Sequence, residues 1–512
     1  MPRNTNTAAV TAAVIMATFL SALDTSVVGT AMPTIIGSLG GLPLYSWVFS
    51  AYLLTSTTTV PVYGRLADVH GRKPVFVAGA TLFLLGSALC GLATNMEQLI
   101  LFRAIQGLGA GAVLPVSLTV VGDVYSLAER ARIQGLLSGV WGVSSILGPA
   151  IGGLITEELT WQWVFYVNLP VGIVAIGLFT LYLRENFTPR KHSIDYVGAA
   201  ALTAGVTLLL LGLLGVGSQG AGLSVPPAPA IGLSLLVLGG FVWHETRVKE
   251  PMLPPSLFRS RVLTVSNGVG VMIGTVLFGV SSFIPPFIQG VQGGSALAAG
   301  AALAPMSLGW PVGSVLGGRA ILRHGYRPIL LLGTGLIAAG SALLIPLDAG
   351  TPRWYVMSAM AVVGLGMGFG ATASLVAVQS AVAWESRGIA TASVQFFRTI
   401  GGAVGVAAMG AMLNSRLQSG LENAGDPAMS GLDLSQRLSA AGDLLDPVAR
   451  GTMATDLVAA LSNVFSSALV GVYAAIALAG LVALAGALLF PRGSVDDHAH
   501  AEVAARESRR NR

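Results

Sequence analysis

The sequence predicts an all-α protein that crosses a membrane many times. Of its 512 residues, 53% are hydrophobic and only 10% are charged, whereas a soluble globular protein carries about 25% charged residues. Apolar stretches of about 20 residues, each long enough to cross ~30 Å of hydrocarbon as a helix, follow one another along nearly the whole chain. The 66 glycines fit helices whose backbones approach closely in a membrane.

Fourteen spans are predicted along the chain. The first apolar run continues through Ile36 without a convincing cleavage site, which favours a span over a signal peptide. The spans fall near residues 9–35, 45–65, 74–94, 97–121, 131–155, 162–183, 195–216, 228–245, 262–289, 295–320, 328–347, 353–382, 387–413 and 462–490.

The basic residues orient these spans. Most of the 28 lysines and arginines fall in alternate loops and at the two ends of the chain, which predicts that both termini are cytoplasmic in a multi-pass protein of the plasma (inner) membrane. The few on the opposite side are Arg353, Arg416, Arg437 and Arg450. Arg103 and Arg398 lie inside spans. The only long segment outside is 414–462, with a helical patch near 432–445.

An internal repeat divides the chain. Three stretches of the first part recur roughly 250 residues later, which predicts two six-helix bundles with two further helices inserted between them. The repeated pairs are Gly64–Pro74 with Gly318–Pro328, Gly107–Gly111 with Gly364–Gly368, and Gly148–Gly153 with Gly401–Gly405. The predicted parts are a bundle at 1–190, an inserted pair with linkers at 191–260, a second bundle at 261–491, and a basic cytoplasmic tail at 492–512.

Five motifs resemble signatures of the major facilitator superfamily, in particular its fourteen-span drug:proton antiporters. They are Leu23–Pro33, Gly64–Lys73, Leu101–Gly109, Gly148–Gly153 and Trp161–Gly172. The resemblance implies the major facilitator fold and transport driven by an ion gradient. None of the three lysines stands in a P-loop, so ATP hydrolysis by this chain is not expected.

Asp24 and Arg103 are the candidates for proton coupling. Asp24 is the only acidic residue well inside a predicted span, where an ionised carboxylate must be paired, neutralised or exposed to a cavity. A carboxylate that gains and loses a proton could exchange it for a cationic substrate. Arg103 needs acceptors, either Asp24 or backbone carbonyls. The alternative is a static tie between helices. In the repeat, Phe278 and Met360 replace the two charges.

Two further groups are assigned to gating. The turn formed by Gly64, Arg65, Asp68, Gly71, Arg72 and Lys73 is predicted to close the cytoplasmic side, with Asp68 near the N-terminus of a helix that starts around Ser386. The basic residues could instead serve topology alone. Gly148 and Pro149 are expected to break the fifth helix, and Gly152 and Gly153, with Gly139 and Gly142, to pack it against its repeat mate.

Substrate contacts are the least determined. Tyr52 and Trp310 are candidates through cation–π contact, and Glu157 through its charge at the outer end of span five, where a solvated role is the alternative. Asp496, Asp497, His498 and His500 resemble a metal cluster, but a solvated tail is favoured, and no metal or cofactor is expected beyond the proton gradient.

These features predict a proton-coupled exporter of hydrophobic, often cationic compounds, as in multidrug efflux and antibiotic resistance. Its expected partners are such small molecules, protons and the lipid bilayer, without nucleic acid; an accessory envelope protein is left open. The alternatives are export of a lipid or other endogenous metabolite and, from another class, a membrane-embedded enzyme or sensor. No nucleophile or base cluster within the spans supports an enzyme.

Overall fold

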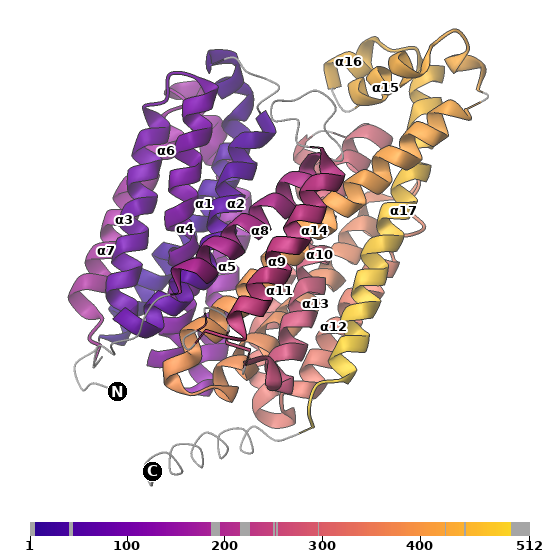
Figure 1. Cartoon of the computed structure of the whole chain (residues 1–512). Helices are drawn as coiled ribbons and strands as arrows, with labels where there is room; N and C mark the ends of the chain where they lie inside the picture. The colour runs from indigo at the N-terminus through magenta and orange to yellow at the C-terminus, as the bar shows by residue number, and fades with distance from the viewer. Residues whose placement is uncertain are drawn as a thin grey trace.

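The protein is described by a computed structural model of the chain. It covers residues 6–39, 45–185, 195–215, 226–248, 251, 254–255, 257–294, 296–424, 426–444 and 447–492. Within these ranges every regular element is helical (Figure 1). The predicted all-α class is therefore confirmed for the part of the chain that the structure describes.

The first bundle contains the helices that precede residue 186. They are α1 (Thr7–Leu39), α2 (Tyr45–His70), α3 (Arg72–Gly91), α4 (Met96–Val124), α5 (Leu127–Glu158), the short α6 (Trp163–Tyr166) and α7 (Asn168–Tyr182). The capping box of α5 pairs Ser126 with Glu129 and satisfies backbone N–H groups that a helix start leaves free.

The second bundle begins after a 3-10 turn at Leu257–Arg259. Its long helices are α10 (Arg261–Pro286), which continues as a π-helical turn (Phe287–Val291), α11 (Ala296–His324), α12 (Tyr326–Ala342), α13 (Arg353–Ala381), α14 (Arg387–Glu422) and α17 (Thr455–Leu488). The short helices α15 (Leu434–Asp443) and α16 (Pro447–Thr452) lie between α14 and α17.

Both described ends of the chain lie at the same end of the bundle. The carbonyl of Thr7 accepts a hydrogen bond from Tyr125, at the end of α4, and the carbonyl of Leu488 accepts one from Arg327, at the start of α12. We call this end the basic face, because it includes the helix ends that carry Arg65, Arg72 and their equivalents. The charge distribution predicts that it is cytoplasmic.

Ten helices in the described ranges are long and apolar enough to cross a membrane. They correspond to α1, α3, α4, α6 with α7, α9 (Pro227–Glu245), α10, α11, α13, α14 and α17. The other four predicted spans are helical as well, as α2, α5, α8 (Tyr196–Gly215) and α12, but they do not meet this criterion. A membrane protein with many spans is supported, and the count of fourteen stays a prediction.

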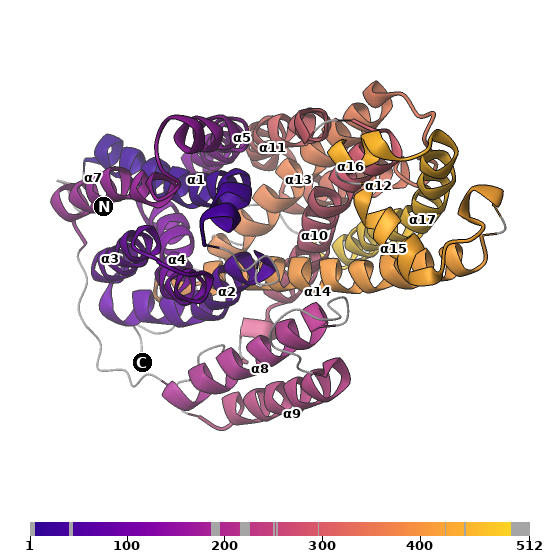
Figure 2. The ribbon, with the colours of Figure 1, turned by 90° about the horizontal axis from the view of Figure 1, so that it is seen from above.

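The two bundles meet along two seams, one between α2 and α14 and one between α5 and α11 (Figure 2). The helix pair α8–α9 lies outside the first seam, where Leu202, Val206 and Phe241 pack against Val60 of α2 and Ile389 of α14. His244 of α9 pairs with Asp195 before α8 at 3.0 Å, which ties the two ends of this helix pair together. The second seam has no such cover in Figure 2.

The repeat is visible in the backbone. Gly71 and Gly325 precede α3 and α12 with φ angles of 95° and 80°, a conformation that favours glycine. Glycines of α4 lie where a Cβ atom would strike α2 and α3, and the matching glycines of α13 lie against α11 and α12. The glycine run at 364–370 therefore serves close packing.

Two predictions about the fifth span are wrong. Helix α5 continues through Gly148 and Pro149, because a membrane bundle can tolerate the one backbone hydrogen bond that a proline removes. It packs against α1 and α11 and not against its repeat mate α14, which lies at the other seam. Helix α14 extends to Glu422 and α17 starts at Thr455, so both helices reach beyond the predicted bounds of the spans at 387–413 and 462–490.

The glycine contacts give a stability prediction. Gly109→Ala would place a Cβ against the backbone of Phe83, so we expect the free energy of unfolding to fall by about 1–3 kcal/mol, as for other overpacked sites. Gly177→Ala is the matched control, because nothing lies within 4 Å of its Cβ position. Thermal unfolding in detergent measures both, and equal melting temperatures would contradict this packing role.

Candidate functional site

A buried polar cluster lies in the first bundle, and we call its members Asp24, Ser87, Arg103, Gln106 and Asn168 the core cluster. Asp24 and Arg103 are each 1% exposed. Their side chains form an ion pair with 2.8 Å between Arg103 Nη1 and Asp24 Oδ2. The structure thus joins the two residues that the sequence singled out from different helices. What they do in transport stays a prediction.

Amide side chains complete the shell of Asp24. Its Oδ1 accepts hydrogen bonds from Gln106 Nε2 at 2.8 Å and from Asn168 Nδ2 at 2.9 Å. Both amides also donate to Ser87 Oγ, at 3.2 and 3.0 Å. Together with Arg103, these donors supply hydrogen bonds to both oxygens of the Asp24 carboxylate.

Arg103 is held on its other sides by groups of α2 and α4. It donates to Gln106 Oε1 at 2.7 Å and to the carbonyl of Val48 at 3.4 Å. Its guanidinium carbon lies 4.1 Å from the centroid of the Tyr52 ring. Tyr52 was a predicted substrate contact, but in this conformation it packs on Arg103 and is buried.

The core cluster therefore connects α1, α3, α4 and the start of α7. The motifs at 101–109 and 161–172 contain Gln106 and Asn168, but their contact with Asp24 could not be read from one sequence. Ser87 gave no signal at all. A serine in an apolar helix resembles any other small residue until its neighbours are known.

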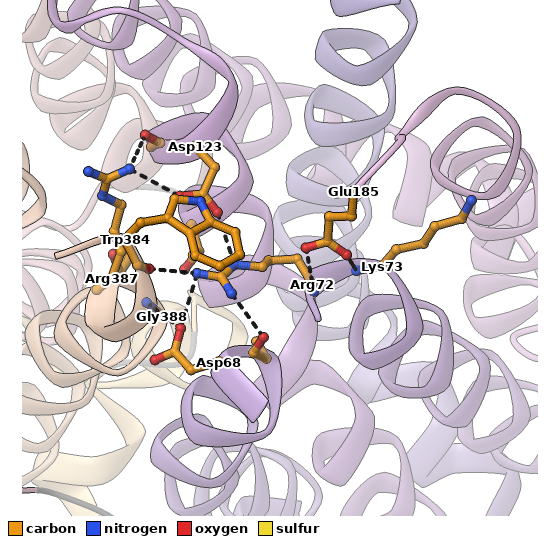
Figure 3. A network of polar contacts seen from close by, with 12 residues as sticks. Asp68, Arg72, Lys73, Asp123, Glu185, Trp384, Arg387 and Gly388 are labelled. Atoms are coloured by element: carbon orange, nitrogen blue, oxygen red, sulfur yellow. Dashed lines mark hydrogen bonds and ion pairs between the residues drawn. The ribbon is translucent and has the colours of Figure 1, made fainter. Parts of the chain in front are cut away.

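A second network links the two bundles at the basic face, and we call Asp68, Arg72, Asp123, Trp384 and Arg387 the closure network (Figure 3). Asp68 Oδ1 accepts from the backbone N–H of Gly388 at 3.0 Å, and Oδ2 accepts from Ile389 at 2.8 Å. These are free N–H groups in the first turn of α14, where the helix dipole also favours a negative charge. The predicted contact between Asp68 and this helix start is present.

Glycines allow this contact. A Cβ on Gly64 would strike Ala392 of α14, and a Cβ on Gly388 would strike the Asp68 carboxylate. Because both side chains are absent, α2 and α14 approach closely enough for a short aspartate to reach the backbone.

Arg72 occupies the centre of the closure network. It is fully buried and forms ion pairs with Asp68 at 3.1 Å and with Asp123 at 2.9 Å. It also donates to the carbonyl of Trp384 at 3.0 Å, with its guanidinium 4.1 Å from the ring centroid of that residue. Arg72 thus joins the two bundles, which a role in topology alone does not explain.

Arg387 and Asp123 add a direct ion pair between the bundles. Arg387 Nη1 lies 3.1 Å from Asp123 Oδ1 and also donates to the carbonyl of Gly122 at 3.0 Å (Figure 3). In the sequence, Arg387 is one loop charge among many and nothing singles out Asp123. A carboxylate at the end of a span is common, so only the fold identifies it.

The other members of the predicted turn have smaller roles. Helix α2 continues through Asp68 to His70, so the turn is reduced to Gly71. Glu185 accepts from the backbone N–H groups of Arg72 and Lys73 at 2.8 and 3.1 Å, and so caps α3. Arg65 is half-buried, and its Nε atom has no hydrogen-bond partner among the described residues.

The glycines predicted to pack α5 against its repeat mate lie against other helices. A Cβ on Gly148 would strike Ser26 of α1, and one on Gly142 would strike the carbonyl of Ser307 of α11. Gly152 is buried. The side chains of Pro149 and Glu157, and the surroundings of Gly153, lie outside what the structure describes, as do Asp496, Asp497, His498 and His500.

Arg398 of α14 is the charge for which the sequence offered no partner. Its guanidinium carbon lies 5.9 Å from the ring centroid of Trp310, on α11. Within the described residues no ion pair or hydrogen bond holds its side chain. Trp310, a predicted substrate contact, therefore stands beside a positive charge.

The fold and these two networks define a polytopic helical membrane protein of two related bundles with paired buried charges. A family model described as Major Facilitator Superfamily matches residues 14–406. The chain belongs to this superfamily of transporters, and its function is transport and not enzymatic catalysis.

Relatives support this assignment. The chain is 41% identical over 402 residues to the "Multidrug transporter protein MdtP" of Bacillus subtilis (strain 168), which covers 78% of this chain and 74% of the relative. It is 33% identical over 431 residues to "Multidrug resistance protein 3" of the same organism, covering 84% and 83%.

Solved structures confirm the fold alone. The human organic anion transporter MFSD10 (TETRAN) aligns with a TM-score of 0.58 at 14% identity and covers 92% of this chain and 99% of that one. The proton:xylose symporter XylE aligns with a TM-score of 0.59 at 13% identity, covering 93% and 94%.

The closure network gives a test of gating. Asp68→Asn would remove the charge that two N–H groups of α14 share, and a charge-assisted hydrogen bond contributes about 1.5–3 kcal/mol. We expect the ratio of open to closed basic face to rise by about 10-fold or more. Electron–electron distances between spin labels at His70→Cys and His324→Cys, both exposed at this face, report the opening.

The native Cys90 is buried, so it should not compete for label. Lys73→Gln is the matched control, because only the backbone of Lys73 makes a hydrogen bond among the described residues. Identical distance distributions for native chain and Asp68→Asn would contradict the closing role.

Proposed function

We propose that this chain is a proton-coupled secondary transporter that exports hydrophobic, often cationic compounds by alternating access. In this proposal both termini face the cytoplasm of a cell whose plasma or inner membrane it spans. The observation that carries the proposal is the buried Asp24, the carboxylate at the centre of the core cluster.

In this proposal the contacts that Asp24 makes with its neighbours depend on whether its carboxyl group is charged. Its ionised form accepts from Arg103, Gln106 and Asn168. A protonated carboxyl carries an O–H donor and no charge, so it cannot keep all of these bonds and leaves Arg103 without a counter-charge. Proton binding would therefore rearrange contacts among α1, α3, α4 and α7.

This rearrangement is a means of coupling. A cationic substrate near the core cluster would compete with Arg103 for Asp24, and a proton would remove the charge for which they compete. The second bundle has Phe278 and Met360 at the equivalent positions. We therefore assign coupling to the first bundle and give the second a role in substrate contact and in movement.

The closure network supplies the other requirement, a face that can open. Asp68, Arg72 and Arg387 all make contacts from one bundle to the other at the basic face. Uptake from the cytoplasm requires these contacts to separate while the two bundles rock about a central site. The glycines of α5 allow close packing at the second seam during this movement.

The substrate class rests on the relatives. MdtP and Multidrug resistance protein 3 of Bacillus subtilis are named for multidrug transport or resistance, at 41% and 33% identity. Export of a lipid or endogenous metabolite is the alternative. It would be favoured if the purified chain bound lipid strongly but bound no dye.

Proteoliposomes with an imposed pH gradient test the coupling. We expect gradient-driven transport of a cationic dye that stops with an uncoupler and continues with vanadate. Asp24→Asn should abolish the gradient-driven component, because the amide cannot bind and release a proton. Asp456→Asn, the same change at an exposed position of α17, is the control and should transport normally. Transport by Asp24→Asn at the native rate would exclude Asp24 from coupling.

Arg398 gives a prediction about substrate charge. Its positive side chain beside Trp310 disfavours a cation at that ring, because like charges repel more strongly where water is scarce. Arg398→Leu should therefore raise transport of a cationic dye relative to a neutral one of similar size. The ratio of the two initial rates measures this, and a ratio equal to that of the native chain would contradict it.

A further inference from the structure

A cavity of about 890 Å³ lies at the second seam, where the two bundles meet without cover from α8 and α9. Its walls come from α1, α5 and α7 of the first bundle and from α11 of the second. Almost all of the lining side chains are apolar, among them Phe19, Leu136, Val143 and Val312. It is distinct from the core cluster and the closure network, since it shares no residue with either.

Two arginines are the only charged residues of this wall. Arg132 comes from the start of α5 and Arg319 from the end of α11, so both lie toward the basic face. Both are exposed, and neither has an ion pair or hydrogen bond to any described residue. No acidic side chain lines the cavity, so two positive charges at one end of an apolar wall lack a counter-charge.

The length of the cavity matches one leaflet of a membrane. From Arg132 to Val143 the wall of α5 advances 11 residues, about 16 Å at ~1.5 Å per residue. Half of a ~30 Å hydrocarbon layer is about 15 Å. The arginines therefore stand at the depth of lipid headgroups when the far end of the cavity stands at the bilayer centre.

The cavity also opens toward the lipid. Leu136, Val143, Val312 and Leu316 line it and have exposed fractions of 48%, 52%, 51% and 46%. Such side chains at a helix seam inside a membrane contact acyl chains. A small water-soluble anion would satisfy the arginines but leave the apolar wall without an occupant.

We propose that this cavity is a binding site for an anionic phospholipid of the leaflet at the basic face. Arg132 and Arg319 bind the phosphate and the acidic headgroup, and one acyl chain fills the space between α1, α5 and α11. Because the two arginines come from different bundles, the bound lipid connects α5 to α11 and favours the closed arrangement of the basic face. The site needs only the fold and its place in the membrane, and does not depend on proton coupling.

Native mass spectrometry of the purified full-length chain tests the headgroup. Phosphatidylglycerol and phosphatidylcholine with the same acyl chains are offered at equal concentration. We expect the native chain to retain phosphatidylglycerol preferentially and Arg132→Gln/Arg319→Gln to lose that preference by about 10-fold or more, since each basic side chain near an anionic surface contributes about 1 kcal/mol.

The control removes the same number of charges elsewhere. Arg259→Gln/Arg323→Gln changes two arginines that are also exposed near the basic face but do not line the cavity. Its preference should equal that of the native chain. Equal loss in both double variants would overturn the proposal, because it would indicate attraction by overall charge.

A second variant tests the acyl-chain wall. Gly139 lines the cavity, and no atom lies within 4 Å of its Cβ position, so Gly139→Phe should fill the cavity without disturbing the fold. Gly177→Phe, equally free of neighbours but outside the cavity, is the control. We expect Gly139→Phe alone to lose retained phosphatidylglycerol at an unchanged melting temperature.

Three further outcomes would overturn the proposal. They are equal retention of the two lipids by the native chain, unchanged retention in Gly139→Phe, and displacement of the lipid by a neutral hydrophobic dye that binds the native chain and the Arg132→Gln/Arg319→Gln variant equally. The last would indicate an entry port for apolar substrate. Dye efflux is measured separately, so a failed lipid test leaves the proton-coupled function standing.

Discussion

The ion pair between Asp24 and Arg103 imposes the main constraint on the first bundle. Neither charge can stay unpaired in an apolar interior, and breaking such a pair by removing one partner costs about 3–5 kcal/mol. The helices that carry the two residues must therefore stay in register, with Gln106, Asn168 and Ser87 placed to complete the hydrogen bonds. The Asp24 carboxylate on α1 thus accepts hydrogen bonds from residues of both α4 and α7.

The two bundles repeat the same backbone with different chemistry. Glycines at equivalent positions bring α4 against α2 and α3, and α13 against α11 and α12. Gly71 and Gly325 start equivalent helices. The charges do not repeat, because Met360 and Phe278 stand where Arg103 and Asp24 would be. Packing follows the symmetry of the repeat, whereas the ion pair between Asp24 and Arg103 has no counterpart at the equivalent positions of the second bundle.

The two seams between the bundles also differ from each other. At the first, backbone N–H groups of α14 bind Asp68, and α8 and α9 add an apolar cover. At the second, α5 and α11 leave an apolar cavity with two unpaired arginines. The closed basic face is thus held by protein contacts along one seam, and we infer a lipid contact along the other.

Much of this could be predicted from the sequence alone. Composition and apolar run length determine an all-α membrane protein, because apolar runs of about 20 residues cross hydrocarbon as helices, which satisfy their own backbone groups. Asp24 and Arg103 could be recognised as candidates, since charged residues inside apolar spans are rare. The Gly64–Lys73 motif and the start of α14 pointed to the contact of Asp68, since a carboxylate at a helix N-terminus is a local rule of chemistry.

Only the tertiary structure decided which residues meet across the chain. Asp123 and Arg387 are ordinary helix-end charges until the fold places them 3.1 Å apart. In the sequence Ser87 is one small residue among many, whereas in the fold its hydroxyl accepts hydrogen bonds from Gln106 and Asn168. The uninterrupted α5 and its contact with α11 contradict a prediction made from Gly148 and Pro149, because uniformly apolar helices have no polar face to reveal their neighbours. Where a helix is apolar on all sides, the fit between side chains of neighbouring helices determines how it packs. That fit exists only in the folded structure.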